Sequence, residues 1–305
     1  MVRRLALLLA LLGPALAPAP AAAADAVTVA SKIDTEGGLL GNLIATALAK
    51  HGLAIVNESQ LGPTEILRAA ILAGQIDIYP EYTGDGAIFF SREGDPVWKD
   101  AQRGYDTVKR LDEAKNGLIW LAPAPADNGW AIAVRQDLAQ ARHLATLEDF
   151  ARTVAAGRRV KLAASAEFVE SAGALPAFEA AYGFTLHQSQ LLILAGGDTA
   201  ATLRAVAEGT SGVNAAMAYA TDGPLAALHL ILLADDRHAQ IVYQPAPVVR
   251  QAVLARHPEI RTILDPIFRS LTLATLQSLN ARIAVDGEAA KAVAASYLAA
   301  RGFGQ

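Results

Sequence analysis

Residues 76–86 read Ile76-Asp77-Ile78-Tyr79-Pro80-Glu81-Tyr82-Thr83-Gly84-Asp85-Gly86, a short alternating apolar run that meets a proline and a glycine-rich corner. The alternation predicts a strand with both isoleucines on one face. Pro80 cannot donate the next ladder bond, so we expect the strand to stop there and Tyr82 to lie just past its carboxyl end. Ligands of open α/β sheets bind at that end, which makes Tyr82 a candidate site residue.

The first 24 residues have the pattern of a secretory signal peptide. Arg3 and Arg4 precede an apolar run from Leu5 to Leu12, and small residues lead to Ala24. The apolar run is too short to span a membrane. We expect cleavage after Ala24 and a soluble periplasmic protein of residues 25–305. The chain has no cysteine, which excludes a lipid anchor at the cleavage point, a disulfide framework and a thiolate metal site.

The charge and the length of the mature chain limit its possible partners and its domain organisation. Without Arg3 and Arg4, 24 Lys and Arg stand against 30 Asp and Glu, a net charge of −6. Such a charge argues against nucleic acid as a partner. The remaining length exceeds the usual size of a single core, which favours two lobes. We expect the protein to act as a monomer.

From Val27 onward, short apolar runs alternate with segments of helical periodicity, which is the pattern of βα units on mostly parallel sheets. Two connectors interrupt this pattern, a Pro/Ala/Gly segment at Ala122–Gly129 and a turn at Thr221–Pro224. We interpret them as two hinge crossings between two lobes. The predicted fold class is therefore α/β, with a hinged cleft between the lobes as in clamshell binding proteins.

The two crossings divide the chain into its lobes. Residues 25–125 and 225–305 form lobe 1, and residues 126–224 form lobe 2. In this interpretation the returning chain adds strands at Leu228–Leu233 and Gln240–Tyr243 to lobe 1.

The sequence has no signature of an enzyme or a metal site. The histidines show no paired metal-ligand spacing, a G-x-S-x-G elbow is absent, and a cysteine nucleophile is excluded. Asp77 and Glu81 are close enough in sequence for an acid–base pair, but two carboxylates at a strand end are more often solvated or capping groups. We predict no catalytic residue, no metal and no cofactor.

Aromatic residues make up only 6% of the chain, yet several lie at the predicted lobe junction. Tyr82 follows the strand described above, Trp130 follows the first connector, Tyr219 precedes the second, and Tyr243 lies in the returning segment. Ring faces attract a cation that cannot donate hydrogen bonds, at about 0.5–2 kcal/mol per ring, and quaternary ammonium is the best-known case. Lys32, in the loop after the first predicted strand, is a candidate anchor for a carboxylate in the same cleft.

Three sets of residues carry a resemblance to a known family, namely Ser31-Lys32 with Thr35-Glu36, Gly74 to Gly84 with its Tyr79-Pro80-Glu81-Tyr82-Thr83-Gly84 segment, and Ala218-Tyr219 with Thr221-Asp222-Gly223. They resemble the substrate-binding proteins of osmoprotectant ABC transporters (ProX/OpuC type). Asp34–Asn42 and the segments 168–171 and 174–178 are most similar to the OsmF (YehZ) branch. The resemblance implies a type II periplasmic-binding-protein fold, a quaternary-ammonium solute such as glycine betaine, proline betaine or choline in an aromatic cage, and the membrane permease of an ABC importer as partner.

The resemblance also assigns ligand-binding residues by position. Trp130 stands where relatives usually have tyrosine, and Lys32 matches the family's carboxylate-binding lysine. With two neighbours of the cage included, the predicted ligand-binding residues are Lys32, Tyr82, Asp85, Asn128, Trp130, Tyr219 and Tyr243.

Two departures from the family pattern argue against tight binding of a carboxylated betaine. Relatives of high affinity place a carboxylate-binding arginine after the residue that matches Phe168, where this chain has Glu170-Ser171. Asp85 replaces a threonine. We expect weak glycine betaine binding that Asp85→Thr or Ser171→Arg improves, with choline less penalised.

Three alternatives remain open. A receptor for an amino acid or another small zwitterion would need hydrogen-bonding groups at the ammonium end in place of bare rings. A periplasmic enzyme would turn over the bound solute. A partner-only protein, for example a sensor subunit, need not hold a ligand in its cleft.

Overall fold

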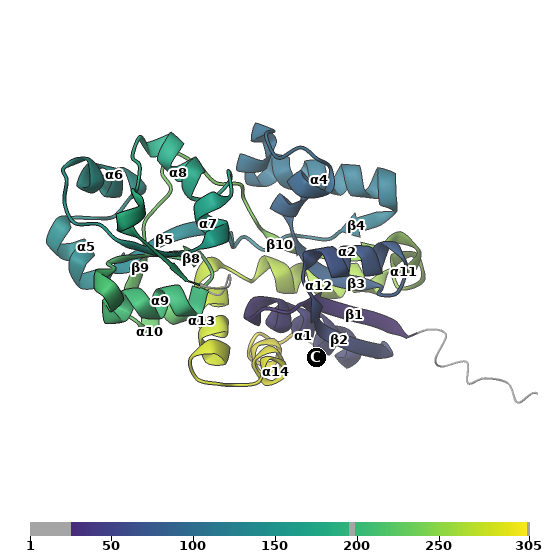
Figure 1. Cartoon of the computed structure of the whole chain (residues 1–305). Coiled ribbons are helices and arrows are strands. Elements are labelled where there is room, and N and C mark those ends of the chain that lie inside the picture. The colour runs from purple at the N-terminus through teal and green to yellow at the C-terminus, as the bar shows by residue number, and fades with distance from the viewer. Residues whose placement is uncertain (1–25, 195–198, 304–305) are drawn as a thin grey trace, which may run out of the picture.

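The structure, a computed structural model, describes residues 26–194 and 199–303, which form two α/β lobes side by side (Figure 1). Each lobe is built on its own five-stranded sheet. The predicted signal peptide, residues 1–24, lies outside the described residues, as does the run 195–198, which we expect to open a helix. None of the helices in the described ranges has the length and apolar character that a membrane span requires.

The first sheet has the strand order β2-β1-β3-β10-β4. β1 pairs in parallel with β2 and β3, whereas β10 runs antiparallel to β3 and β4. Because side chains alternate across a strand, Val29 and Ile78 enter one core while Ala30 and Tyr79 enter the core on the other face. The strands are β1 (Val27–Lys32), β2 (Ile55–Gly62), β3 (Ile78–Tyr82), β4 (Leu118–Trp120) and β10 (Pro245–Arg250).

The second sheet repeats this arrangement with the order β7-β6-β8-β5-β9. β6 is parallel to β7 and β8, and β5 is antiparallel to β8 and β9. In each sheet the antiparallel inner strand is the one through which the chain enters from the other lobe, β5 after β4 and β10 after β9. The strands are β5 (Trp130–Arg135), β6 (Leu162–Ser165), β7 (Leu191–Leu194), β8 (Ala215–Tyr219) and β9 (Leu230–Leu232).

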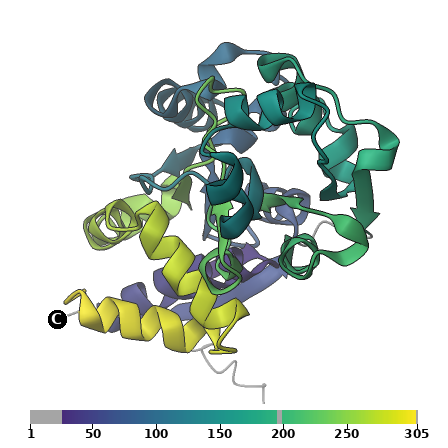
Figure 2. The same ribbon diagram turned by 90° about the vertical axis from the view of Figure 1, so that its left-hand side faces the viewer.

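Helix α1 is buried between the first sheet and the C-terminal helices α12, α13 and α14, which are yellow to yellow-green in Figures 1 and 2. Apolar residues on nearly all sides of α1, such as Leu39 and Leu43, explain this position. The helices packed in the first lobe are α1 (Thr35–Lys50), α2 (Thr64–Leu72), α3 (Gly86–Phe89), α4 (Ala101–Asn116), α11 (Gln251–Arg256), α12 (Glu259–Arg269), α13 (Leu273–Ala284) and α14 (Ala290–Ala300). Those of the second lobe are α5 (Gln136–Arg142), α6 (Leu147–Ala155), α7 (Ala166–Glu170), α8 (Leu175–Tyr182), α9 (Thr199–Glu208) and α10 (Pro224–Ala227).

Strand β3 continues through its proline, so the prediction that the strand stops at Pro80 is wrong. Pro80 lies opposite Pro247 in the antiparallel pair of β3 and β10. The carbonyl of Pro247 accepts a hydrogen bond from Leu121 on the far side of β10. The ladder between β3 and β10 therefore needs no N–H at this pair, and both prolines are tolerated. Tyr82 is consequently the last residue of the strand.

The second predicted crossing is also wrong. Thr221–Pro224 leads into the short helix α10, and β9 then pairs with β5 in the second sheet. Lobe 2 thus extends past residue 224, and the chain returns to lobe 1 only through residues 233–244. Gln240–Tyr243 is not a strand, because its backbone bonds elsewhere, for example from Val242 N to Trp98 O at 2.9 Å.

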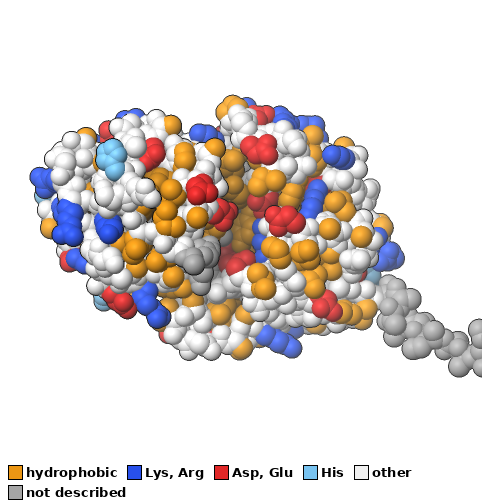
Figure 3. Space-filling view, in the orientation of Figure 1, with side chains coloured by type: hydrophobic (Ala, Val, Ile, Leu, Met, Phe, Trp, Pro, Cys, Tyr) orange, Lys and Arg blue, Asp and Glu red, His pale blue; other side chains and the backbone are white. Residues whose placement is uncertain are grey.

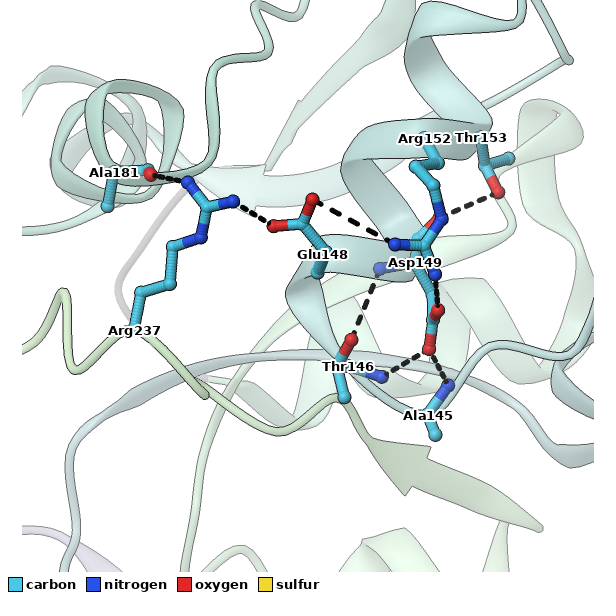
Figure 4. Close-up of polar contacts among 8 residues, drawn as sticks. All are labelled: Ala145, Thr146, Glu148, Asp149, Arg152, Thr153, Ala181 and Arg237. Carbon is cyan, nitrogen blue, oxygen red and sulfur yellow. Dashed lines mark hydrogen bonds and ion pairs between the residues drawn. The ribbon is translucent and has the colours of Figure 1, made fainter.

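Thr146 followed three residues later by Asp149 is a sequence pattern that predicts a capping box, and the N-terminus of α6 has this capping box (Figure 4). The Thr146 side chain accepts from Asp149 N at 3.2 Å, and the Asp149 carboxylate accepts from Thr146 N at 2.9 Å. Glu148, one residue earlier, forms an ion pair with Arg237 of the returning chain. The cap therefore fixes the start of α6, and the ion pair fixes the path of the chain after β9.

Candidate functional site

Strands β1 and β3 end near each other and bring three charged side chains together. Lys32 is the last residue of β1, and its Nζ lies 2.6 Å from Glu81 Oε1 and 2.8 Å from Asp85 Oδ2. Glu81 belongs to β3, and Asp85 to the 3₁₀ turn Thr83–Asp85 that follows it. None of the three side chains is more than 12% exposed. Lys32 is therefore part of a buried ion-pair cluster at the end of a strand, where we expected a loop lysine.

The three groups of this cluster balance one another. Burial alone would lower the pKa of Lys32, but the charges of Asp85 and Glu81 more than offset it and raise that pKa. Burial raises the pKa of Glu81 to about 8. Burial works in the same direction on Asp85, yet the Lys32 charge and a hydrogen bond with Glu81 hold its pKa below the usual range. The two carboxyl groups thus share one buried ammonium, and Asp85 is the one whose ionised form is favoured.

The ring of Tyr82 already faces a cation. Lys32 Nζ lies 4.6 Å from the ring centroid, within the range of a cation–π contact. The Tyr82 hydroxyl donates to Glu36 Oε1 at 2.8 Å, and the residue is only 5% exposed. The ring is thus held by its hydroxyl and accepts positive charge on its face.

Tyr243 lies against the turn that follows β3. A Cβ built on Gly84 would meet Tyr243 Cδ1 at 2.6 Å, so the ring packs directly on the Gly84 backbone. Tyr243 N donates to Asp127 Oδ1 at 2.7 Å, and Tyr243 O accepts from Asn128 N at 2.9 Å. Glycine at position 84 is therefore a requirement for seating the Tyr243 ring beside the Lys32 cluster.

The remaining two rings form a stack on lobe 2. Trp130 on β5 is the register partner of Tyr219 on β8, and their rings stack at 4.3 Å between centroids with an interplanar angle of 25°. Phe168 of α7 contacts the Trp130 ring edge-on at 5.3 Å. Cross-strand pairing of β5 and β8 thus fixes both rings, and Phe168 supports them from the lobe-2 core.

A hollow lies between the two lobes, with hydrophobic side chains in it and acidic side chains at its edges (Figure 3). Burial raises the pKa of Tyr219, and so do the charges of Glu167 on its own lobe and Asp34 on lobe 1. Burial also raises the pKa of Tyr243. The charge of Asp85 raises it further, and so does the charge of Glu167 on the other lobe. The two tyrosines therefore lie within electrostatic reach of the opposite lobe.

Asn128 joins the first crossing to the second lobe. Its Oδ1 accepts from Thr221 Oγ1 at 2.7 Å. A hydrogen bond from the Asn128 side chain lowers the pKa of Tyr82. Burial of Tyr82 has the larger effect, so the pKa of this tyrosine is raised overall. Asn128 thus touches the cage through Tyr82, and its carbonyl oxygen is already engaged by Thr221.

Sequence reasoning missed two buried residues behind the cage. Glu36, in the first turn of α1, accepts from Tyr82 and from Asn280 of α13. Glu36 appeared only as part of a family-like segment, and a helix residue 244 positions away gives no signal of contact. Within the described ranges, no group of three or more His, Asp or Glu residues is placed to hold a metal ion.

Two α/β lobes on matching sheets, with aromatic rings from both at the crossings, define a two-lobed solute-binding protein of the type II periplasmic-binding-protein fold. Residues 25–300 match the family model described as the substrate binding domain of ABC-type glycine betaine transport systems. The chain belongs to this family, whose members bind a transport substrate and are not enzymes.

Named relatives agree with this assignment. The chain is 59% identical over 280 residues to the glycine betaine-binding protein YehZ of Escherichia coli K12, covering 92% of each chain. It is 32% identical over 281 residues to a glycine-betaine-binding protein of Pseudomonas aeruginosa, covering 90% of this chain and 88% of that one. The solved structure of apo YehZ from Escherichia coli superposes with a TM-score of 0.81 over 91% of this chain and 99% of that chain.

Proposed function

We propose that this protein binds quaternary-ammonium compatible solutes, such as glycine betaine or choline, between its lobes and delivers them to the membrane permease of an ABC importer. The observation that carries the proposal is the distribution of rings. Tyr82 and Tyr243 lie beside the end of β3, and the Trp130–Tyr219 stack lies on the sheet of the other lobe. Closing such lobes on a cation surrounds it with electron-rich faces that need no hydrogen bond from it.

The same residues support weak binding of a betaine carboxylate. Rings at about 1–2 kcal/mol each give roughly 4–8 kcal/mol before the cost of association. Micromolar binding needs about 8 kcal/mol, so the cage alone reaches micromolar affinity at best. Lys32 would be the natural carboxylate partner, yet Glu81 and Asp85 already occupy its ammonium. We therefore propose that glycine betaine binds weakly and that choline, without a carboxylate, is less penalised.

The cellular setting follows from the same proposal. A substrate-binding protein of an importer meets its solute outside the cytoplasmic membrane, which fits the periplasm and the signal-peptide pattern of residues 1–24. We propose cleavage after Ala24 and a monomer that presents its two lobes to the permease. The names of its relatives support glycine betaine as the first solute to test.

Calorimetry with glycine betaine, choline, carnitine and a set of amino acids tests this function. We expect binding of quaternary-ammonium solutes, and a loss of at least about tenfold in affinity for Tyr82→Ala, Trp130→Ala, Tyr219→Ala and Tyr243→Ala. Phe at the tyrosine positions should be milder because the ring face remains. If alanine at every ring leaves the affinity unchanged, the cage assignment is wrong, and binding of amino acids alone would favour a receptor for another zwitterion.

A further inference from the structure

A buried carboxylate stands directly behind the cage. Glu36 is 5% exposed, and its Oε1 accepts the Tyr82 hydroxyl at 2.8 Å while its Oε2 accepts Asn280 Nδ2 at 2.8 Å. Those partners are neutral donors, and the residue lies in the first turn of α1, where the helix dipole favours a negative charge. The structure therefore places a buried carboxyl group at the hydroxyl end of the ring that Lys32 contacts on its face.

The contacts of Glu36 extend into lobe 2. Asn280 Nδ2 also donates to Thr221 O at 3.0 Å, and Thr221 Oγ1 donates to Asn128 Oδ1 at 2.7 Å. Gly223 packs so closely on α13 that a Cβ there would meet Ala281 N at 2.2 Å. The segment after β8 thus packs against α13, and Asn280 of α13 donates hydrogen bonds both to this segment and to Glu36. Tyr82 of lobe 1 and the Thr221 segment of lobe 2 are joined through one carboxylate.

We propose that Glu36 is a positioning residue of the cage, which as a carboxylate orients the Tyr82 ring, adds negative charge behind it for the solute cation, and links it through Asn280 to lobe 2. This inference rests on the proposed function. A charged acceptor makes a stronger hydrogen bond with a phenol than a neutral one and holds the ring more firmly. Across roughly 8 Å at an intermediate effective dielectric constant, one unit charge changes the affinity for a cation by about fivefold.

Ionisation of Glu36 occurs near neutral pH. Burial raises its pKa to about 7, partly offset by side-chain interactions with Thr221, Tyr82 and Asn280, while the charge of Asp34 adds to the rise. Asp34, the N-cap of α1, adds its charge, Tyr82 of β3 and Asn280 of α13 donate to the carboxyl group, and the Thr221 segment carries one further carboxylate, Asp222, which accepts from Tyr219 N and Thr199 Oγ1. Beyond Tyr82 lies the Lys32 cluster, in which Glu81 titrates at about pH 8. Solute affinity should therefore rise with pH, first through Glu36 and then through Glu81.

The test is calorimetry with choline and glycine betaine at about pH 6 and about pH 7.5, a range that favours Glu36 over Glu81. We expect choline to bind about threefold more tightly at the higher pH, because most but not all of the Glu36 ionisation falls within this range, and Glu36→Gln to remove this gain. Asn280→Ala withdraws one donor and should move the midpoint of the gain to higher pH. Glu58→Gln, at an exposed position on β2, is the charge-matched control and should keep the gain.

Two further measurements separate this inference from the function on which it rests. In a Tyr82→Phe background the link is already broken, so Glu36→Gln should cost less affinity than in the unmodified protein. Without any solute, the free energy of unfolding in urea should fall as pH rises from about 4.5 to about 7, because the folded protein holds the Glu36 proton longer than the unfolded chain. Glu36→Gln should remove that part of the decline.

Each outcome decides between the two claims. A pH gain that disappears in Glu36→Gln, persists in Glu58→Gln and is coupled to Tyr82 supports the inference. Binding that is independent of pH and unchanged in Glu36→Gln overturns it while the proposed function stands. Absence of binding by any quaternary-ammonium solute overturns the proposed function, and the role of Glu36 toward a cation with it.

Discussion

Asp85 limits how far the ammonium of Lys32 is available to bind the carboxylate of a ligand. Its carboxylate lies 2.8 Å from Lys32 Nζ, and the Lys32 charge lowers the pKa of Asp85 while burial raises that of Glu81, so Asp85 is the main negative charge beside this lysine. A negative charge beside the cage attracts the cation of any solute and repels the carboxylate of a betaine. One side chain therefore biases the site toward cations without a carboxylate.

Asp85→Thr should reverse that bias. Loss of the Asp85 carboxylate frees one hydrogen-bonding direction of Lys32 for the carboxylate of a betaine, so glycine betaine should gain affinity relative to choline. The ratio of the two affinities should move by about tenfold, or about 1.4 kcal/mol. Calorimetry at matched salt measures it, with Asp85→Asn as the isosteric comparison. Submicromolar glycine betaine binding by the unmodified protein would contradict the reasoning, because a further carboxylate partner would then exist.

Side-chain types in the sequence are enough to propose the rings as cage residues but not to predict the contacts that those rings make. Tyr82, Trp130, Tyr219 and Tyr243 are candidates because aromatic residues are scarce in the chain, yet several lie at the predicted lobe junction, and that chemistry is local. The ion pair of Lys32 with Glu81 depends on where β3 ends. Pro80 suggests a strand end before Glu81, so the sequence does not predict this ion pair. Contacts such as Glu36 with Asn280 depend on tertiary packing, which no local pattern encodes.

The turn after β3 is the element on which the first-lobe side of the site depends. Thr83–Asp85 forms one turn of 3₁₀ helix, and Thr83 N bonds to Gln244 O at 3.0 Å, which brings the returning chain alongside. Gly84 lies beneath Tyr243 with no room for a side chain. The turn thereby sets the separation between the Tyr243 ring and the Lys32 cluster.

Gly84→Ala should displace the Tyr243 ring. The added Cβ would lie 2.6 Å from Tyr243 Cδ1 and 2.7 Å from Ile241 Cγ2, so one of these side chains has to move. We expect a loss of about 1–3 kcal/mol in the free energy of unfolding and weaker solute binding, measured by urea unfolding and calorimetry. Gly94→Ala is the control, since nothing lies within 4 Å of a Cβ there. Unchanged binding in Gly84→Ala would remove Tyr243 from the site.

Elements with their own start and stop signals were predicted well. The charged stretch Asp100–Asn116 predicts an exposed helix, and α4 occupies it with Asp100 as its N-cap. The spacing of Thr146 and Asp149 likewise predicts the cap of α6. The assignment of β9 failed because the signals at Thr221–Pro224 mark a reversal without saying which sheet receives the next strand. Pairing of β9 with β5 follows from the free edge of the second sheet, a property of the assembled lobe.

The two crossings lie side by side and form the only covalent connections between the sheets among the described residues. The first crossing runs between β4 and β5 and the second between β9 and β10, and they are hydrogen-bonded where Asn128 N meets Tyr243 O at 2.9 Å. Tyr243 and Trp130 lie on or directly after these segments. Rotation about the paired crossings therefore changes the distance between the ring pairs while each sheet stays rigid.

Solute should shift an equilibrium between open and closed lobes, because the rings of both lobes can contact one cation only when the lobes approach. Small-angle scattering with and without saturating glycine betaine or choline should show a smaller radius of gyration in the bound state. Trp130→Ala removes one ring of the lobe-2 stack but leaves the crossings intact, so at equal solute concentration it should bind less and compact less. Asn280→Ala loosens the contact of the Thr221 segment with α13 and should alter the solute-free radius, since that contact bears on the resting lobe angle. An equal radius of gyration for the bound and the free protein would contradict hinge closure. The cage would then already be assembled before the solute binds.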